Sequence, residues 1–374
     1  MKIKIKKELL LEGLNKVSKA ISTKNLIPIL SGIKFELTNN GLTLTASDND
    51  ITIQAFIPNK DESMTVEKEG SIIIQGKYIL DIVRKLPDEY INIEVIDELK
   101  ILIYTENSEF NLNGINKQEY PSITLENSKN YVIVDNKKFK TLVNQIAFAV
   151  SHDESRPILT GVNMKITGNI LECSATDSYR LAKKQLELKD SVTENYNVIV
   201  PGKNILEFIK IVGDSSENLE IHIFNNKLLF KQDNLLFQTR LVSGNYPNVN
   251  NLIPSDSILK ITANLDNLYN VIDRASILTS DKEKNVVTLE TINDLLIVKS
   301  SSAEIGRVEE KMKIQKNNDE NIKISFSARY MMDALKSFEG DTVEISFVGE
   351  VKPIIVKDIN DSELIQLVLP IRTY

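Results

Sequence analysis

The sequence predicts an α+β protein built from three similar domains, each with two helices packed on mostly antiparallel sheet. Two observations predict this class. The chain has 374 residues, more than the roughly 250 to 300 at which a single hydrophobic core stops growing. It also repeats one pattern of helical and strand-like segments three times. We expect the domains at residues 1–127, 128–254 and 255–374.

Each copy opens with a helical segment whose apolar residues recur at helical spacing. In the first copy these residues are Leu10, Leu14, Val17 and Ile21. The second copy repeats the pattern 129 residues later (139 − 10), with Phe139, Val143, Ile146 and Val150. The segment from Asn267 to Leu278 is a weaker third version.

Two strand-like segments follow each opening helix, and turn residues bound them. They cover residues 32–35 and 42–48 in the first copy, 161–164 and 171–177 in the second, and 286–289 and 295–301 in the third. Asp48 and Asp177 end the matching segments of the first two copies, again 129 residues apart (177 − 48).

A second helix follows in every copy, and its charged residues repeat at positions i, i+4 and i+7. The three sets are Lys77, Asp81, Arg84; Lys203, Glu207, Lys210; and Arg329, Asp333, Lys336. Because each residue turns the helix by about 100°, the two cations of a set point in nearly the same direction.

Exposed cations on a helix usually serve only to keep it hydrated. Three pairs spaced 126 residues apart (203 − 77, 329 − 203) are less easily explained that way. If the domains curve with these helices inward, the cations would line a concave surface. A surface that meets only phosphates is blind to base sequence and permits sliding along a duplex.

The composition limits the other classes of protein. The net charge is −7, which argues against nucleic-acid binding through a generally basic surface, so any DNA contact must rest on local charge. No apolar run approaches the roughly 20 residues that span a bilayer. The N-terminus lacks the apolar core of a signal peptide, and the single cysteine, Cys173, cannot form an intramolecular disulfide. We expect a soluble, cytoplasmic protein with no membrane partner.

Several segments, taken together and in order, resemble the bacterial DNA polymerase III beta subunit family, the sliding clamps, over essentially the whole chain. They are residues 24–30 (KNLIPIL), 175–182 (ATDSYRLA), 245–247 (NYP) and 369–374 (LPIRTY). The resemblance implies a head-to-tail homodimer whose six domains form a closed ring around DNA. It also implies a separate clamp loader and no catalytic residue, metal or cofactor in this chain.

The resemblance further implies a pocket between the second and third domains that binds short linear peptides of polymerase subunits, the clamp loader and repair proteins. A largely apolar cleft with a few polar groups suits such peptides. The matching positions are Arg156, Leu159, Thr176, Ser178, Tyr179, Arg180, Leu181, Pro247, Leu252, Tyr330, Val351, Pro353, Leu367, Val368, Leu369, Pro370 and Arg372. Departures from the family pattern are Tyr179, Asn251 and Pro353, which bear on peptide preference.

The same resemblance assigns two further groups of residues. Lys24 matches a basic loop position that faces DNA, and it joins the six helix cations in that role. Phe110, Ile277 and Leu278 match positions where the first domain of one subunit meets the third domain of the other. A head-to-tail contact of this kind uses two different patches on each subunit.

Two alternative classes remain to be weighed. A hydrolase could use a carboxylate pair, or Cys173 with His152 or His222 and Asp177. The alternating pattern around Cys173 favours a buried structural thiol. Residues 70–77 nearly form a phosphate loop, with a spacing one residue too long and Tyr78 in place of Ser or Thr. A scaffold that binds peptides without encircling DNA would use the same groove and would not depend on the helix cations.

Overall fold

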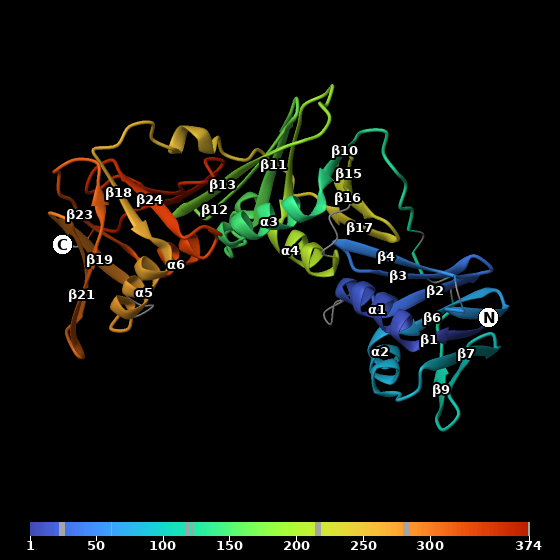
Figure 1. The fold of residues 1–374 in the computed structure, drawn as a ribbon. Coiled ribbons are helices and arrows are strands. Elements are labelled where there is room, and N and C mark those ends of the chain that lie inside the picture. Colours follow the sequence, from blue (N-terminus) through green and yellow to red (C-terminus); the bar gives the residue numbers. More distant parts are fainter. Residues whose placement is uncertain are drawn as a thin grey trace. The chain divides into compact units, whose positions relative to one another are not determined.

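The computed structural model describes residues 1–21, 27–60, 62–116, 118, 120–121, 123–213, 218–279 and 285–372 (Figure 1). These residues form two compact units, Met1–Asn136 with Glu207–Leu241, and Lys137–Leu206 with Val242–Tyr374. None of the helices found in the described ranges has both the length and the apolar character needed to cross a membrane.

The first unit holds two sheets. The five-stranded sheet has the order β5-β1-β7-β8-β9. Its strands are β1 (Lys2–Lys6), β5 (Met64–Lys68), β7 (Tyr90–Asp97), β8 (Lys100–Tyr104) and β9 (Glu109–Asn113). The eight-stranded sheet has the order β10-β15-β16-β17-β4-β3-β2-β6. Its strands are β2 (Gly32–Thr38), β3 (Gly41–Ser47), β4 (Ile51–Pro58), β6 (Gly70–Gln75), β10 (Tyr131–Asp135), β15 (Asn218–Ile223), β16 (Lys227–Gln232) and β17 (Leu235–Arg240).

The second unit also holds two sheets. The nine-stranded sheet has the order β14-β11-β12-β13-β26-β25-β24-β18-β22. Its strands are β11 (Gly161–Thr167), β12 (Ile170–Thr176), β13 (Arg180–Glu187), β14 (Tyr196–Pro201), β18 (Leu259–Asn264), β22 (Gln315–Lys316), β24 (Thr342–Phe347), β25 (Ile354–Asp358) and β26 (Leu364–Val368). The four-stranded sheet has the order β21-β20-β19-β23. Its strands are β19 (Val286–Ile292), β20 (Leu295–Ser302), β21 (Gly306–Lys313) and β23 (Lys323–Ser327).

Every strand pair among the described residues is antiparallel, which confirms that part of the predicted class. Two of these pairings join successive thirds of the chain into continuous sheets. Strand β17 pairs with β4, with Leu235 opposite Ala55, and β13 pairs with β26, with Leu181 opposite Leu367.

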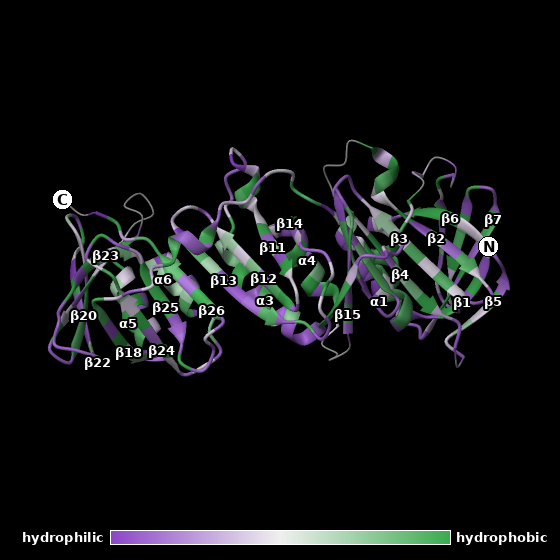
Figure 2. Ribbon diagram, turned by 90° about the horizontal axis from the view of Figure 1, so that it is seen from above, coloured by the Kyte–Doolittle hydropathy of each residue, from purple (hydrophilic) through white to green (hydrophobic). Residues whose placement is uncertain are grey.

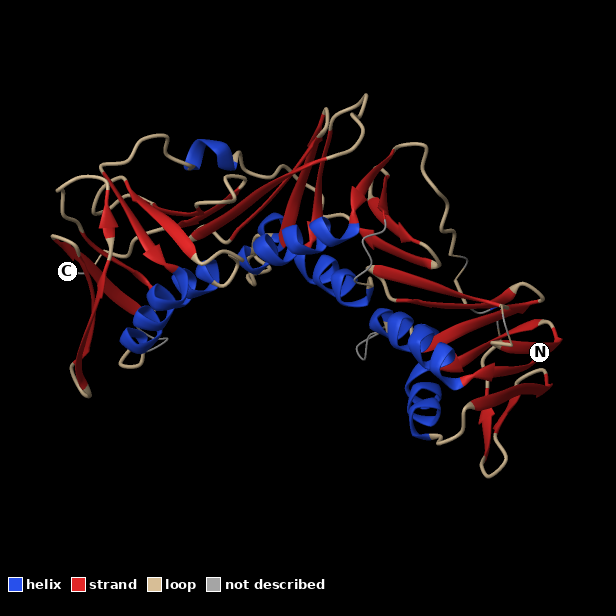
Figure 3. Cartoon of the chain, viewed as in Figure 1, coloured by secondary structure: helices blue, strands red, loops and turns tan. Residues whose placement is uncertain are grey.

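Six α-helices lie in the described ranges, two for each third of the chain (Figure 3), as the repeat predicts. They are α1 (Lys7–Val17), α2 (Gly76–Lys85), α3 (Asn136–Ile146), α4 (Gly202–Ile211), α5 (Leu265–Ser276) and α6 (Ala328–Leu335). The starts of α1, α3 and α5 are 129 residues apart (136 − 7, 265 − 136), and those of α2, α4 and α6 are 126 apart (202 − 76, 328 − 202).

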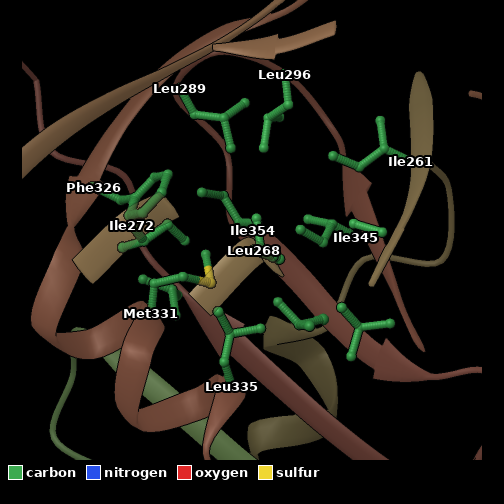
Figure 4. Packing of buried hydrophobic residues seen from close by; sticks show 14 of the residues in the cluster. Ile261, Leu268, Ile272, Leu289, Leu296, Phe326, Met331, Leu335, Ile345 and Ile354 are labelled. Carbon is green, nitrogen blue, oxygen red and sulfur yellow. The ribbon is translucent and has the colours of Figure 1, made fainter. Parts of the chain in front are cut away.

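The helices bury one face and the strands bury alternate residues, so hydrophobic bands cross the sheets (Figure 2). In the last third of the chain, Leu268 and Ile272 of α5 and Met331 of α6 point toward Leu289 and Ile345 of the facing strands (Figure 4). All five side chains are at most 1% exposed. This core holds α6 in place beside the end of β26.

Candidate functional site

A tight turn between β12 and β13 positions the first predicted site residues. Asp177 Oδ1 accepts hydrogen bonds from the backbone N–H groups of Tyr179 (2.9 Å) and Arg180 (3.0 Å). Thr176 Oγ1 accepts one from the N–H of Ser178 (3.1 Å). Ser178 has a φ of 78°, a left-handed conformation that non-glycine residues rarely adopt, and these bonds hold it there. The turn leaves the Tyr179 side chain 55% exposed.

Arg180 follows the turn and is buried, with a side chain that is 7% exposed. Its Nε donates to Asp177 Oδ2 (3.0 Å), and its Nη1 donates to Asp333 Oδ2 of α6 (2.6 Å). Its guanidinium also lies over the rings of Tyr330 (4.6 Å) and Phe148 (5.3 Å). A buried charge must be paired in this way. The pairing with Asp333 also links the middle part of the chain to its last part.

A cavity of about 770 Å³, here called the larger cavity, opens beside this turn. Leu181 and Leu367 form its apolar floor with Val249, which lies beneath them. Leu252 and Leu369 also line it and remain 51% and 36% exposed. Exposed apolar side chains around a hollow mark a site that a ligand can cover.

A second cavity of about 540 Å³, the smaller cavity, shares Leu369 with the larger one. The rings of Tyr179 and Tyr330 line it and stack, with centroids 6.4 Å apart. The backbone N–H of Leu369 donates to the carbonyl of Tyr179 (2.9 Å), and that of Ile371 donates to the carbonyl of Ser325 (2.7 Å). These bonds fix the segment after β26 between the two cavities.

All but two of the predicted pocket residues line one of these cavities. The larger cavity takes Arg156, Leu159, Thr176, Ser178, Arg180, Leu181, Pro247, Leu252, Pro353, Leu367 and Leu369. The smaller cavity takes Tyr179, Tyr330, Leu369, Pro370 and Arg372. Val351 is 56% exposed and lines neither. Val368 is fully buried in the core because it faces the opposite side of β26 from Leu367.

Several lining residues were not predicted. They are Pro157, Ile158 and Asn245 in the larger cavity, and Asn285, Ser327, Arg329 and Ile371 in the smaller one. The repeat contains a signal for two of them, because Pro157-Ile158-Leu159 matches Pro28-Ile29-Leu30 at the same offset of 129 (157 − 28). Both segments form a short 3₁₀ turn.

The six predicted helix cations are all exposed, but their surroundings differ. Arg84 pairs with Asp81 (3.7 Å) and Lys210 with Glu207 (2.8 Å). Lys336 lies over the ring of Tyr269 (5.3 Å), and its contact with Tyr269 raises the pKa of the ammonium. In the described part of the chain, Lys77, Lys203 and Arg329 have no ion-pair partner.

Comparison with known proteins accounts for the whole chain. Three family models match successive parts: the DNA polymerase III beta subunit N-terminal domain at residues 1–124, the central domain at 133–248 and the C-terminal domain at 250–372. The "Beta sliding clamp" of Bacillus subtilis is 41% identical over 378 residues, with all of both chains covered. The chain belongs to the DNA polymerase III beta subunit family.

Other members of the family agree in sequence and in structure. The "Beta sliding clamp" of Staphylococcus epidermidis is 40% identical over 377 residues, with complete coverage of both chains. The crystal structure of the DNA polymerase sliding clamp from Bacillus subtilis matches all of this chain with a TM-score of 0.96 and 41% identity. The DNA polymerase III beta chain of Streptococcus pneumoniae matches with a TM-score of 0.95 and 36% identity, also over both full chains.

The remaining residues that the resemblance assigned lie on different elements. Lys24 lies outside the described residues. Phe110 is on β9, an edge strand of the five-stranded sheet, and is 36% exposed. Ile277 directly follows α5 and is 73% exposed, while Leu278 beside it is half-buried.

The residues considered for a nucleophilic site each have a different environment in this fold. Cys173 is fully buried, and burial raises the pKa of its thiol well above the ordinary value, so the reactive thiolate is disfavoured. Asp177 caps its own turn. His222 contacts Glu220 (2.9 Å) and the carbonyl of Ser128 (3.2 Å), and His152 is exposed.

Proposed function

We propose that the protein is a DNA polymerase processivity factor, a sliding clamp that encircles duplex DNA and tethers a polymerase to it. One observation carries this proposal: relatives named "Beta sliding clamp" match the chain from end to end. The three-domain repeat agrees with this role. A tether performs no chemistry, so the protein is a non-catalytic subunit. Its place of action is the cytoplasm, where bacterial DNA lies.

The ring is a head-to-tail homodimer of domains at residues 1–127, 128–254 and 255–374. A closed ring forms from such contacts only when the rotation closes, here after two subunits. Phe110 and Ile277 support this assembly, because both are exposed apolar side chains on the domains that would meet. The outer edge of β9, which pairs with no further strand among the described residues, offers another surface for contact.

Local positive charge makes the contact with DNA. The proposed contacts are Lys24, Lys77, Arg84, Lys203, Lys210, Arg329 and Lys336. The helix cations support this proposal, because they recur at equivalent places on α2, α4 and α6 and are exposed. Because phosphate contacts carry no sequence information, such a surface allows sliding on any duplex. A net charge of −7 keeps the rest of the protein from binding DNA generally.

The two cavities bind short linear peptides of polymerase subunits, the clamp loader and repair proteins. An apolar hollow with a few fixed polar groups can take the large side chains of an extended peptide. The larger cavity supports this assignment, because Leu252 and Leu369 expose apolar surface on its rim and Leu181 lies at its floor. Tyr179 lines the smaller cavity.

The deciding experiment compares retention on circular and linear DNA. The protein is loaded onto nicked circular plasmid with ATP and the clamp loader of Bacillus subtilis, and free protein is removed by gel filtration. The plasmid is then cut once with a restriction enzyme, or mock-treated. We expect the protein to stay on circles and to leave the cut DNA through its free ends.

Equal loss from circular and cut plasmid would contradict topological linkage. A peptide-binding scaffold that does not encircle DNA would then explain the cavities better. As a control, protein-bound blocks at both ends of the linear DNA should restore retention, because sliding is stopped without any change in surface contacts.

A further inference from the structure

A buried polar network lies where the second and third domains meet. Lys184 Nζ donates hydrogen bonds to Gln145 Oε1 (2.6 Å) and Asp361 Oδ2 (2.7 Å). Gln366 Nε2 donates to the backbone carbonyl of Gln145 (2.8 Å) and to Ser337 Oγ (2.8 Å). Gln366 is 1% exposed and Gln145 is 4% exposed. These five residues, here called the polar network, tie elements of both domains to one another.

The polar network and the floor of the larger cavity lie on opposite faces of the same two strands. Leu181 on β13 is paired with Leu367 on β26, and both line the cavity. Side chains alternate between the two faces of a strand, so Lys184 on β13 and Gln366 on β26 point away from the cavity. The residues of the polar network are not among the described residues that line either cavity. The network can therefore affect a bound peptide only through the positions of the two strands.

The repeat supplies a comparison within the chain. Strands β4 and β17 join the first domain to the second, as β13 and β26 join the second to the third, and each pairing covers five residue pairs. Four residues of the polar network have equivalents in this first junction, at the repeat offset of 129 or 126. They are Ala55 for Lys184 (184 − 55), Phe237 for Gln366 (366 − 237), Lys16 for Gln145 (145 − 16) and Ile211 for Ser337 (337 − 211). Asp361 belongs to residues 359–363, which connect β25 to β26, whereas the equivalent connection between β16 and β17 is shorter, at residues 233–234.

The first junction cannot form this network, because apolar side chains stand at three of the four equivalent positions. Ala55, Phe237 and Ile211 have no polar side-chain atom, and Lys16 pairs with Glu12 of its own helix (2.6 Å). A cavity of about 400 Å³ is left there, lined in part by Lys16, Ala55 and Ile211. The same strand pairing therefore joins two domains without a polar network, so the network of the second junction serves another purpose.

We propose that the polar network holds β13 and β26 in one relative position, so that the larger cavity has its binding shape before a peptide arrives. The cavity lies across the two strands, which belong to different domains, and a slide of one domain past the other would change its width. Packed apolar surfaces permit small slides of this kind, whereas a satisfied network of directional hydrogen bonds favours one arrangement. A cavity that is already formed costs less free energy to order on binding. Gln366 and Lys184 are thus positioning residues, and this inference rests on the proposed peptide-binding function.

Stopped-flow fluorescence anisotropy with a labelled peptide tests this role. The probe is a fluorescein-labelled hexapeptide with an amidated C-terminus and adjacent Leu and Phe residues as apolar anchors, mixed with the full chain. Gln366→Met and Lys184→Met keep roughly the length of each side chain and remove its hydrogen bonds. We expect each variant to bind the probe about threefold to tenfold more slowly, because the fraction of molecules with a formed cavity falls by that factor. The dissociation rate should stay the same, because the contacts of the bound peptide are unaltered.

Two other variants separate this role from a loss of stability and from a loss of contact. Thr291→Val removes a buried hydrogen bond of the same domain, since Thr291 Oγ1 accepts from the N–H of Ile322 (2.9 Å), and Thr291 lines neither cavity. It should lower the melting temperature about as much as Gln366→Met and leave the association rate unchanged. Leu367→Ala removes part of the cavity floor and should instead raise the dissociation rate. Thermal unfolding verifies that each variant is folded, and Lys184→Met serves alone if Gln366→Met is not.

Three results would overturn the inference. Association rates of Gln366→Met and Lys184→Met equal to that of the unaltered protein would show that the cavity keeps its shape without the network. An equal loss in Thr291→Val would assign the effect to general destabilisation. Both of these results would leave the peptide site standing. Failure of the probe to bind the unaltered protein would contradict the proposed peptide site itself, and the inference with it.

Discussion

At the residue scale, equivalent aspartates in two copies of the repeat, Asp48 and Asp177, make the same kind of hydrogen bonds. Asp48 Oδ1 accepts from the backbone N–H groups of Asp50 (2.8 Å) and Ile51 (2.7 Å), as Asp177 does from those of Tyr179 and Arg180. The repeated aspartate is therefore a turn-forming residue. The other three positions of the turn differ between the copies, and the fourth holds Ile51 in the first copy and Arg180 in the second.

Among the predicted pocket residues, Arg180 is buried and forms ion pairs with both Asp177 and Asp333. Replacing it with Met would leave Asp177, whose side chain is 12% exposed, without its partner. Removing one member of a buried ion pair is strongly destabilising, so Arg180→Met should lower the free energy of unfolding by about 3 kcal/mol. Urea unfolding followed by circular dichroism measures this change.

Arg156→Met is the control for that measurement. Arg156 is exposed, and its Nη1 makes only a long contact with Ser178 Oγ (3.4 Å), so its loss should change stability by about 0.5 kcal/mol or less. Equal midpoints for the two variants would show that the Arg180 network does not hold the domains together.

The sequence could identify Arg180 as a pocket residue through resemblance, but it could not show the pairing with Asp333. The two residues are 153 positions apart, and the spacing on α6 placed Asp333 only as the acidic member of a charged set. Val368 shows the opposite limit. The resemblance assigned it to the pocket with Leu367 and Leu369, whereas the alternation of a strand directs it into the core.

At the scale of elements, the helices were the most predictable part of the fold. Leu268, Ile272 and Ala275 of α5 occupy the places of Phe139, Val143 and Ile146 shifted by 129 (268 − 139), and all three are buried. In the sequence the third copy is a weaker match, because Ala275 is small and has a polar residue on either side of it in the chain. The start of α5 nevertheless keeps the period, because the packing requires a buried face and not particular residues.

The cations of α2 permit a test of the proposed DNA-facing surface. Ile79 and Val83 anchor the helix in the core, and Lys77 and Arg84 stay exposed, so Lys77→Glu with Arg84→Glu should leave the fold intact. Each lost phosphate contact should reduce the slope of log K against log salt by about 0.9. Anisotropy titrations of a short labelled duplex measure this slope. The salt concentration runs from about 20 to 150 mM, a range over which exposed charges become increasingly screened.

The matched control reverses two cations of the same unit that lie on strands. Lys68→Glu with Lys100→Glu makes the same change in net charge at exposed positions of β5 and β8. If both double variants lose the same amount of slope, net charge governs DNA binding and the helix surface has no special role.

At the scale of the whole molecule, the strand pairings between thirds of the chain lay beyond sequence reasoning. The repeat predicted three domains with two helices and antiparallel strands, and this much is confirmed. It gave no sign that β4 would pair with β17 or β13 with β26. Such pairings depend on backbone groups at open sheet edges, which every strand carries, so side-chain patterns do not specify the partner.

The proposed head-to-tail dimer leads to a prediction that depends on its two patches being different. Ile277→Asp and Phe110→Asp each place a charge at a proposed contact, and burying an unpaired carboxylate costs several kcal/mol. Each variant alone should therefore sediment as a monomer at micromolar concentration. Ile359→Asp is the control, because Ile359 is also exposed (55%) and apolar but lies outside the proposed patches; it should remain dimeric.

Mixing the two monomeric variants should recover dimers. The Ile277→Asp chain keeps an intact first domain and the Phe110→Asp chain an intact third domain, so together they form one undamaged contact. Analytical ultracentrifugation of the equimolar mixture should show the dimer mass, whereas the separate variants should not. If each patch met its own copy, the Ile277→Asp chain would keep an intact contact between two Phe110 patches and the Phe110→Asp chain an intact contact between two Ile277 patches. Each variant would then dimerise by itself, and mixing would add nothing.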